Sequence, residues 1–169
     1  APQPLRPLAR RHGHLVAGVH GALLAGAHFM STIRDIMTSH VITLSPEEDL
    51  IKADAIMKRG RLRHIPVVGA DGELVGLITH RDLLRAQIKA LGMDAGESCT
   101  TLAALPAKEN MTSNVLTAAP DDDPVEIARH MLEHKVGCMP VVEDGKLVGI
   151  VSEADFVRWA LDLVSRAAA

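Results

Sequence analysis

The feature that most constrains this chain is an internal repeat. Three segments of the first half recur in the same order in the second: MTSHVITLSPEED (37–49) as MTSNVLTAAPDDD (111–123), RHIPVV (63–68) as GCMPVV (137–142), and DGELVGLITHRDLL (71–84) as DGKLVGIVSEADFV (144–157). Self-similarity of this extent indicates that one structural unit has been duplicated. The halves differ by one residue in a glycine-containing turn, which a duplicated unit tolerates.

Both halves predict the element order β-α-β-β-α. A short β-rich run (41–44; 115–117) precedes a helix, two apolar strands follow around an Asp-Gly turn (65–68 and 74–79; 139–142 and 147–152), and a helix closes the unit (80–90; 153–165). An Asp-Gly turn between apolar runs is a hairpin signal. The predicted class is α/β, an α+β sandwich. Because one such unit buries a poor core alone, we expect the two to pack sheet to sheet.

The first helix of each half is predicted from its capping residues. In the first half, Ser45 is the expected N-cap, with Pro46 at N1 and Glu48 completing a capping box. In the second half Ala119 takes the cap position, and the acidic run 121–123 suits the positive end of the helix dipole. The predicted buried stripes are Ile51, Ala55, Ile56 and Met57 in one helix and Ile127, Met131 and Leu132 in the other.

The predicted organisation is a leader-like extension (1–30), a first unit (31–90), a linker (91–106) and a second unit (107–165). Arginines precede an apolar run at 15–27, which superficially resembles a signal peptide. His20 and several glycines interrupt that run, which is too short to span a bilayer. We therefore expect a disordered or helical arm.

Composition disfavours several kinds of partner. The net charge of −3 creates no general field for nucleic acid or an anionic membrane. The aromatic residues are Phe29, Phe156 and Trp159 alone, so stacking platforms for single-stranded nucleic acid are missing. Cys99 and Cys138 form no CxxC motif, which favours a reducing, cytoplasmic compartment over a disulfide scaffold or zinc ribbon.

Three motifs together resemble the cystathionine-β-synthase (CBS) domain, here as a stand-alone tandem pair. They are the Ile33-Arg-Asp-Ile-Met-Thr segment, the x-Pro-Val-Val strand and the Gly-h-h-Thr/Ser-x-x-Asp loop, where h is hydrophobic. The resemblance runs from Ile33 to about Val164. It implies a regulatory module, not an enzyme, that binds an adenosine-containing ligand such as AMP, ADP, ATP or S-adenosylmethionine. It also implies a homodimer and an unidentified regulated protein. The alternative is a constitutive dimerisation scaffold with vestigial clefts.

The Thr79-x-x-Asp82 and Ser152-x-x-Asp155 loops have two interpretations. Each spacing makes an ordinary capping box at a strand-to-helix junction. A carboxylate at such a turn can also accept both hydroxyls of a ribose, beside helix N-terminal amides that suit phosphate. The family resemblance favours ligand binding.

The resemblance further implies two unequal clefts, each built from both halves. One combines Ser152 and Asp155 with Val41, Ile42, Thr43, Arg63, His64, Ile65 and Pro66. The other combines Thr79 and Asp82 with Val115, Leu116, Cys138, Met139 and Pro140, while His80 and Arg81 can add charge to either. Guanidinium binds phosphate in a fork, so the Arg63 cleft is the expected nucleotide site. Glu153 would repel a third phosphate, which favours AMP or ADP. The alternative is that Arg63 and His64 are merely solvated.

Two further groups are expected to be structural. His130 and His134 are four residues apart on a predicted helix, a spacing that can chelate zinc, but such exposed pairs are usually solvated, so no metal site is predicted. Cys138 is expected to fill the core beside Pro140, because no local arrangement activates it.

Overall fold

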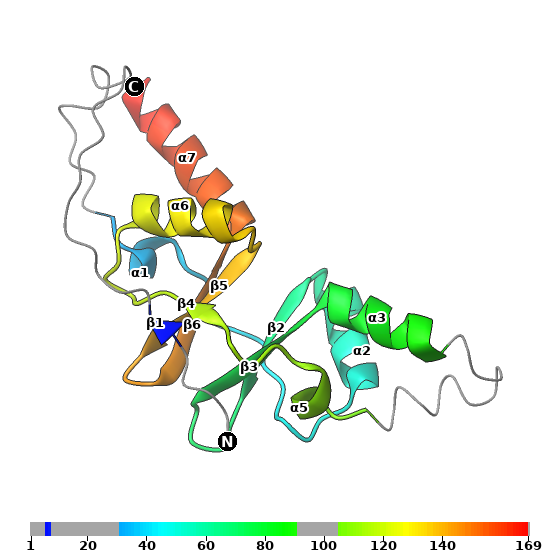
Figure 1. Ribbon diagram of the computed structural model, residues 1–169. Coiled ribbons are helices and arrows are strands. Elements are labelled where there is room, and N and C mark those ends of the chain that lie inside the picture. The colour runs from blue at the N-terminus through cyan, green and yellow to red at the C-terminus, as the bar shows by residue number, and fades with distance from the viewer. Residues whose placement is uncertain (1–5, 8–30, 91–104, 169) are drawn as a thin grey trace.

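The computed structural model describes residues 6–7, 31–90 and 105–168. The expectations for the leader run and for most of the linker therefore lie outside the described residues. The elements are β1 (Arg6–Pro7), α1 (Ile33–Ile36), α2 (Leu50–Gly60), β2 (His64–Val68), β3 (Leu74–Thr79), α3 (His80–Ala90), α5 (Ala107–Asn110), β4 (Leu116–Thr117), α6 (Pro124–His134), β5 (Cys138–Glu143), β6 (Lys146–Ser152) and α7 (Glu153–Ala167), shown in Figure 1.

The predicted hairpins are confirmed. β2 pairs antiparallel with β3, and β5 pairs antiparallel with β6. Gly72 in the first turn has φ of 81° and Gly145 in the second has φ of 80°, a left-handed conformation that glycine adopts without strain. The predicted strand at 41–44 is reduced to a single parallel bridge between Leu44 and Val67. In the second half the matching run forms β4, which pairs with β1.

The predicted helix starts are wrong by four residues. Asp49, not Ser45, is the N-cap of α2, and its carboxylate accepts the Lys52 N–H at 2.8 Å. In α6 the N-cap is Asp123, followed by Pro124 at N1. The segment from Ser45 to Glu48 is instead a separate turn, in which the Ser45 N–H donates to Glu48. The capping-box pattern was present in the sequence, but it closes this turn and not the helix.

The buried faces of these two helices differ in part from the predicted stripes. In α2 the buried residues are Leu50, Ala53 and Met57, whereas Ile51 is 37% exposed. Ala55 is exposed as well, so these two predicted core positions are wrong. In α6 Ile127 and Met131 are buried as predicted, but Leu132 is 78% exposed. The helical period was read correctly, but the core takes Leu50 and Ala53 in place of Ile51 and Ala55.

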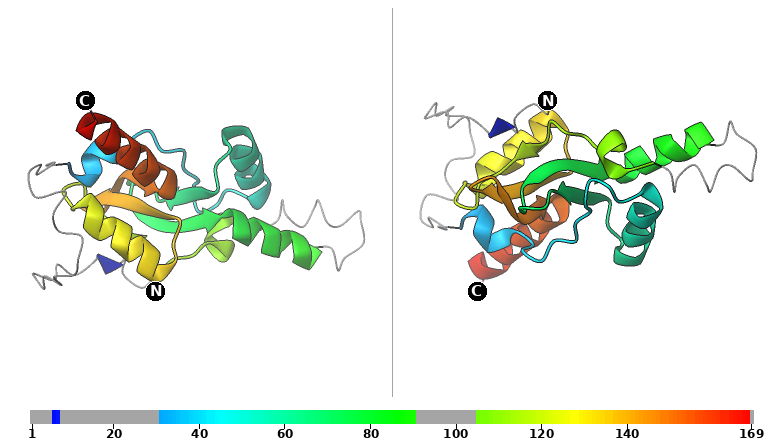
Figure 2. Two further views of the ribbon diagram at one scale, coloured as in Figure 1. Left: turned by 90° about the horizontal axis from the view of Figure 1, so that it is seen from above. Right: turned by 90° about the horizontal axis from the view of Figure 1, so that it is seen from below.

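The two halves exchange their first short helices. Ile33 of α1 belongs to the core of the second half, with Met139 and Val151, whereas Ala107 of α5 belongs to the core of the first half. Backbone hydrogen bonds fix the exchange: the Ile33 N–H donates to the Asp122 carbonyl at 3.0 Å, and the Ala107 N–H donates to Glu48 at 2.7 Å. Both views in Figure 2 show α1 beside α7, and α5 packs against β3 of the first half.

The repeated Met-Thr-Ser and Leu-Val-Gly motifs are partners across this exchange. Thr38 and Ile150 exchange two backbone hydrogen bonds, and Thr112 and Leu77 do the same. Met37 lies against Gly149, and Met111 lies against Gly76, so closely that a Cβ at either glycine would overlap the methionine sulfur. These glycines are therefore required by close packing between the halves.

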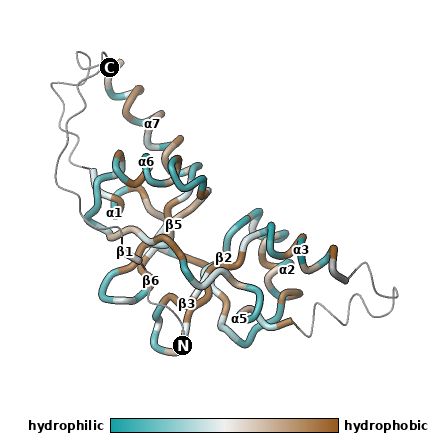
Figure 3. The backbone as a smooth tube through the Cα atoms, in the orientation of Figure 1, coloured by the Kyte–Doolittle hydropathy of each residue, from teal (hydrophilic) through white to brown (hydrophobic). Residues whose placement is uncertain are grey.

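The sheets meet in a third apolar cluster, as the predicted sheet-to-sheet packing requires. Leu77, Val115 and Cys138 are buried there, with Ile150 packed against them. Figure 3 shows hydrophobic residues, in brown, along the central strands. Within the part of the chain that the structure describes, no helix is long and apolar enough to cross a bilayer.

Candidate ligand-binding site

A cavity of about 680 Å³ opens between the two halves. This volume lies within the usual range for small-molecule sites. The lining residues come from both halves: Arg63, His64, Leu77, Thr79, His80, Arg81, Leu84, Thr112, Asn114, Val115, Leu116, His134, Lys135, Val136, Gly137, Cys138 and Glu153.

The floor of the cavity is apolar. Leu77 of β3, Val115 before β4 and Cys138 at the start of β5 belong to the central cluster that joins the sheets. Burial, with a smaller contribution from the charge of Glu153, raises the pKa of the Cys138 thiol to about 12. Because the thiolate is the reactive form, this cysteine is inert at neutral pH and serves as core, in agreement with the prediction.

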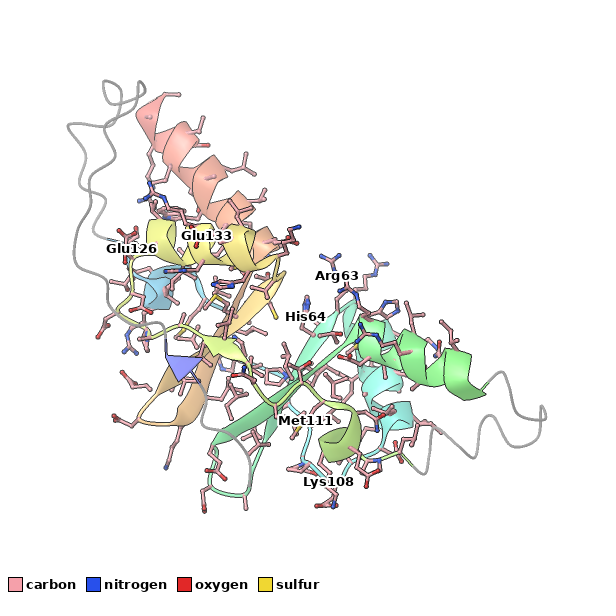
Figure 4. The ribbon with its side chains drawn as sticks, viewed as in Figure 1. Arg63, His64, Lys108, Met111, Glu126 and Glu133 are labelled. Carbon is pink, nitrogen blue, oxygen red and sulfur yellow. The ribbon has the colours of Figure 1, made fainter. Side chains whose placement is uncertain are left out.

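The mouth of the cavity is basic. Arg63 precedes β2 and His64 begins it, His80 and Arg81 begin α3, and Lys135 follows the last residue of α6. Figure 4 shows Arg63 and His64 at the end of β2 that is nearest to α6. Positive side chains from three elements thus converge where an anion could enter.

Glu153 is the acidic residue that lines this mouth. Its Oε2 lies 3.8 Å from Nη2 of Arg63, and both side chains are largely exposed. An exposed pair at this distance contributes little stability and is easily displaced. Arg63 therefore remains available to an incoming phosphate.

His64 is neutral at physiological pH. Burial of the ring lowers its pKa below the usual 6.5, the charge of Arg63 lowers it further, and Glu153 and Asp82 act in the opposite direction. A bound phosphate would favour the protonated ring, so anion binding and protonation of His64 would be coupled.

The Thr79 loop forms a capping box. Oδ2 of Asp82 accepts the Thr79 N–H at 2.8 Å and its hydroxyl at 2.6 Å, and the Asp82 N–H donates back to that hydroxyl at 3.3 Å. Oδ1 accepts from Arg85 at 3.3 Å, but the Arg85 side chain is 66% exposed. Thr79 lines the cavity, and Asp82 lies just behind it. The structural role of this pair is shown; its ribose role stays a prediction.

The Ser152 loop repeats this geometry in a more buried setting. Oδ2 of Asp155 accepts the Ser152 N–H at 2.8 Å and its hydroxyl at 2.6 Å, while Oδ1 accepts from Arg158 at 2.6 Å. Asp155 is only 5% exposed. Its carboxylate is thus more fully engaged than that of Asp82.

Several predicted site residues lie in the protein core. Ile65, Pro66, Met139 and Pro140 are buried, and the Pro66 and Pro140 carbonyls accept the N–H groups of Leu44 and Ala118. These four hold the site's strands in place and do not line the cavity. Thr43 is exposed and Ile42 is 51% exposed, in the segment expected to complete the Ser152 cleft.

The structure groups the remaining predicted residues differently from the sequence analysis. Arg63 and His64, which were assigned to the Ser152 cleft, line the same cavity as Thr79, Arg81 and Leu116. His64 pairs with Thr79 across the β2–β3 hairpin, so the pairing register alone brings them together.

His134 and Lys135 were not predicted to belong to the site. The repeat contains a signal for Lys135, since it aligns with Arg61, and both residues end their helix in the left-handed conformation. A basic residue at that position places its positive charge just beyond the C-terminal end of the helix. The approach of α6 to β2, however, is decided only by the tertiary packing.

The fold and the paired loops define a tandem α+β module, and comparison with known proteins identifies the family. The model of the CBS domain matches residues 33–89 and again residues 107–162. The chain therefore belongs to the CBS domain family, with two copies in tandem.

Solved structures agree with this assignment. The chain is similar to AcuB from Vibrio cholerae, with 37% identity, a TM-score of 0.70, and coverage of 80% of this chain and 94% of that one. It is similar to CBSX2 in complex with AMP, with 26% identity, a TM-score of 0.68, and coverage of 79% and 98%. It is also similar to the CBS domain pair of protein MJ0100 in complex with 5′-methylthioadenosine and S-adenosyl-L-methionine, with 30% identity, a TM-score of 0.63, and coverage of 77% and 95%.

Some relatives are longer proteins. The chain spans 45% and 24% of the length of two curated relatives that it matches at 30% and 33% identity. The resemblance to those proteins therefore concerns only a part of each.

Proposed function

We propose that this chain is a regulatory module that binds an adenine nucleotide in the cavity between its halves and catalyses no reaction. The observation that carries the proposal is one cavity with an apolar floor and a basic mouth, which suits a purine at one end and phosphate at the other. The similar proteins solved with AMP and with S-adenosyl-L-methionine support an adenosine-containing ligand.

The polarity of the cavity supports one orientation of the proposed ligand. The purine would lie on Leu77, Val115 and Leu116, and the ribose would lie at Thr79, which lines the cavity. Asp82, which is hydrogen-bonded to Thr79, would lie behind it. Carboxylate oxygens have about four lone-pair sites, so Asp82 can accept ribose hydroxyls while it caps α3.

The phosphates would then lie at Arg63, His80 and Arg81, where charge-assisted hydrogen bonds are strongest. Glu153 at the same mouth opposes a third phosphate, so AMP and ADP are the favoured ligands.

The Ser152 loop is proposed as a second, weaker site. Asp155 is buried and bound to Arg158, so a ribose would have to compete for its oxygens. The segment with Ile42 and Thr43 is exposed and available to pack against a base. This cleft would suit an adenosyl group with less negative charge, such as S-adenosylmethionine.

We further propose that the chain signals as a homodimer whose packing changes on ligand binding and is sensed by a partner protein. Val157, Leu161 and Val164 form a stripe along α7 and are between 60% and 67% exposed. Such an apolar helix face is typical of an interface. Light scattering should show a two-chain mass that Leu161→Glu reduces to one.

Calorimetry tests the ligand proposal. Folded, ligand-free protein is titrated with AMP, ADP, ATP and S-adenosylmethionine, and AMP or ADP should bind more tightly than ATP. Arg63→Ala should weaken AMP binding, whereas Arg59→Ala, on α2 and outside the cavity lining, should not. Absence of heat with every ligand would favour the competing function, a dimerisation scaffold whose Asp82 and Asp155 serve only as helix caps.

A further inference from the structure

The last turn of α6 brings three potential metal ligands together. His130, Glu133 and His134 each offer one ligand atom, and these atoms all lie within 4.8 Å of one another. The two imidazole rings are nearly parallel, with centroids 6.3 Å apart and planes inclined by 18°. The sequence pattern indicated only the histidine pair. The structure adds the carboxylate, which completes a set of two nitrogen donors and one oxygen donor.

The inner histidine has a ring nitrogen without a hydrogen-bond partner. Nδ1 of His130 is buried and accepts or donates no hydrogen bond among the described residues. Oε2 of Glu133 lies 3.8 Å away, too far for a hydrogen bond. Two ligands of one tetrahedral zinc ion are about 3.3 Å apart, because each bond is about 2.0–2.1 Å. A shift of a few tenths of an ångström would let both atoms bind one ion.

The position on the helix also favours a cation. His134 is the last residue of α6, where unpaired carbonyl groups create the negative end of the helix dipole. The helix is eleven residues long, so the two histidines are held one turn apart on a rigid element.

We infer that His130, Glu133 and His134 form a binding site for a divalent transition-metal ion of the Zn²⁺ type. Imidazole nitrogen with one carboxylate oxygen selects Zn²⁺, Ni²⁺ or Cu²⁺ over Mg²⁺ and Ca²⁺, which prefer oxygen ligands. Three protein donors leave one coordination position for water or an external ligand.

The site is adjacent to the ligand cavity, since His134 also lines the cavity mouth. A bound ion would add positive charge beside the basic residues there and strengthen anion binding. This consequence rests on the proposed function, whereas the metal site itself does not. A titration without nucleotide therefore tests the site separately.

The test is a Zn²⁺ titration of the full chain in competition with a chromophoric chelator. Other histidines can bind zinc, so the measured quantity is the difference between variants. His134→Gln and the double variant His130→Gln/His134→Gln should each lose one equivalent of bound Zn²⁺. Glu133→Gln should lower the affinity for that Zn²⁺ ion by about tenfold or more. His40→Gln, a change at an exposed histidine on another segment, should bind as wild type does.

Two further measurements exclude misfolding of the variant and metal binding through a cysteine. Thermal unfolding without metal should be the same for wild type and His134→Gln, because that side chain is exposed. Cobalt bound at this site should show visible d–d bands without thiolate charge transfer. The inference is overturned if His134→Gln keeps the wild-type zinc stoichiometry and affinity, or if His40→Gln loses the same equivalent.

Discussion

The two halves share one backbone plan and differ in their charges. The first half carries Arg63 and His64 before its β2 proline, where the second half has Gly137 and Cys138. The first loop continues from Thr79 with His80 and Arg81, where the second has Glu153 and Ala154 after Ser152. The capping geometry of the two loops is nevertheless the same to within a few tenths of an ångström.

The first strand of each half also differs. Val115 is 5% exposed and Thr117 is 7% exposed, because β4 pairs with β1 and lies on the central cluster. Of the equivalent residues in the first half, Thr43 is exposed and Val41 is only partly buried. A duplicated fold can thus keep its hydrogen-bonded frame while only one of its clefts gains a basic mouth.

The largest expected effect comes from exchanging the loop charges. Replacing His80 and Arg81 with the second-half residues, as His80→Glu/Arg81→Ala, should weaken AMP binding about 30- to 100-fold. The change removes charge-assisted hydrogen bonds and adds a repulsive carboxylate. Calorimetry measures the affinity.

The reciprocal change is the control. Glu153→His/Ala154→Arg should improve ATP binding relative to AMP, because the acidic residue at the mouth is lost. Equal AMP affinity in both variants and wild type would mean that the halves do not differ as ligand sites.

The next effect concerns the glycine–methionine contact that occurs once in each half. Gly149→Ala should lower the free energy of unfolding by about 1–3 kcal/mol, because the new methyl group overlaps Met37. Gly76→Ala, facing Met111, should cost a similar amount. Urea unfolding gives both values.

A double-mutant cycle sharpens this point. Gly149→Ala should cost less when Met37→Ala is already present, since the smaller side chain leaves room. Strict additivity of the two changes would contradict the proposed contact.

A smaller effect distinguishes the roles of the Asp82 and Asp155 carboxylates. Asp155→Ala and Asp82→Ala should each lower stability by about 1 kcal/mol through loss of a helix cap. Only Asp82→Ala should also weaken AMP binding in the cavity between the halves, whereas the sequence pattern predicted the nucleotide site at Asp155. Loss of AMP binding in Asp155→Ala alone would restore that earlier assignment.

The smallest effect is the pH dependence from His64. Its pKa in the folded chain is lowered below 6.5, so the folded state disfavours protonation. The stability that depends on a neutral His64 is fully present above pH 6.5 and is lost as the pH falls through the lowered pKa. Urea unfolding between pH 7.5 and 5 should show this decline, and His64→Gln should lack that component. An identical decline in the variant would assign it to other groups.

The local elements were predictable from the sequence. The hairpins follow from apolar runs around Asp-Gly turns, and α3 and α7 follow from a Thr/Ser-x-x-Asp signal at each strand end. The helix starts at Asp49 and Asp123 were misplaced by four residues, because Ser45 and Ala119 begin separate turns that end just before the true caps. Local sequence rules identify the candidate helix caps, and tertiary packing decides which of them begins the helix.

The sequence by itself determined that the chain is a duplicated CBS unit with paired loops, since repeats, turns and helix caps depend on neighbouring residues. Only the tertiary structure decided that α1 and α5 exchange partners, that Arg63 and Thr79 share one cavity, and that Glu133 joins the two histidines. These features depend on contacts between distant segments or on side-chain direction. A linear pattern specifies neither.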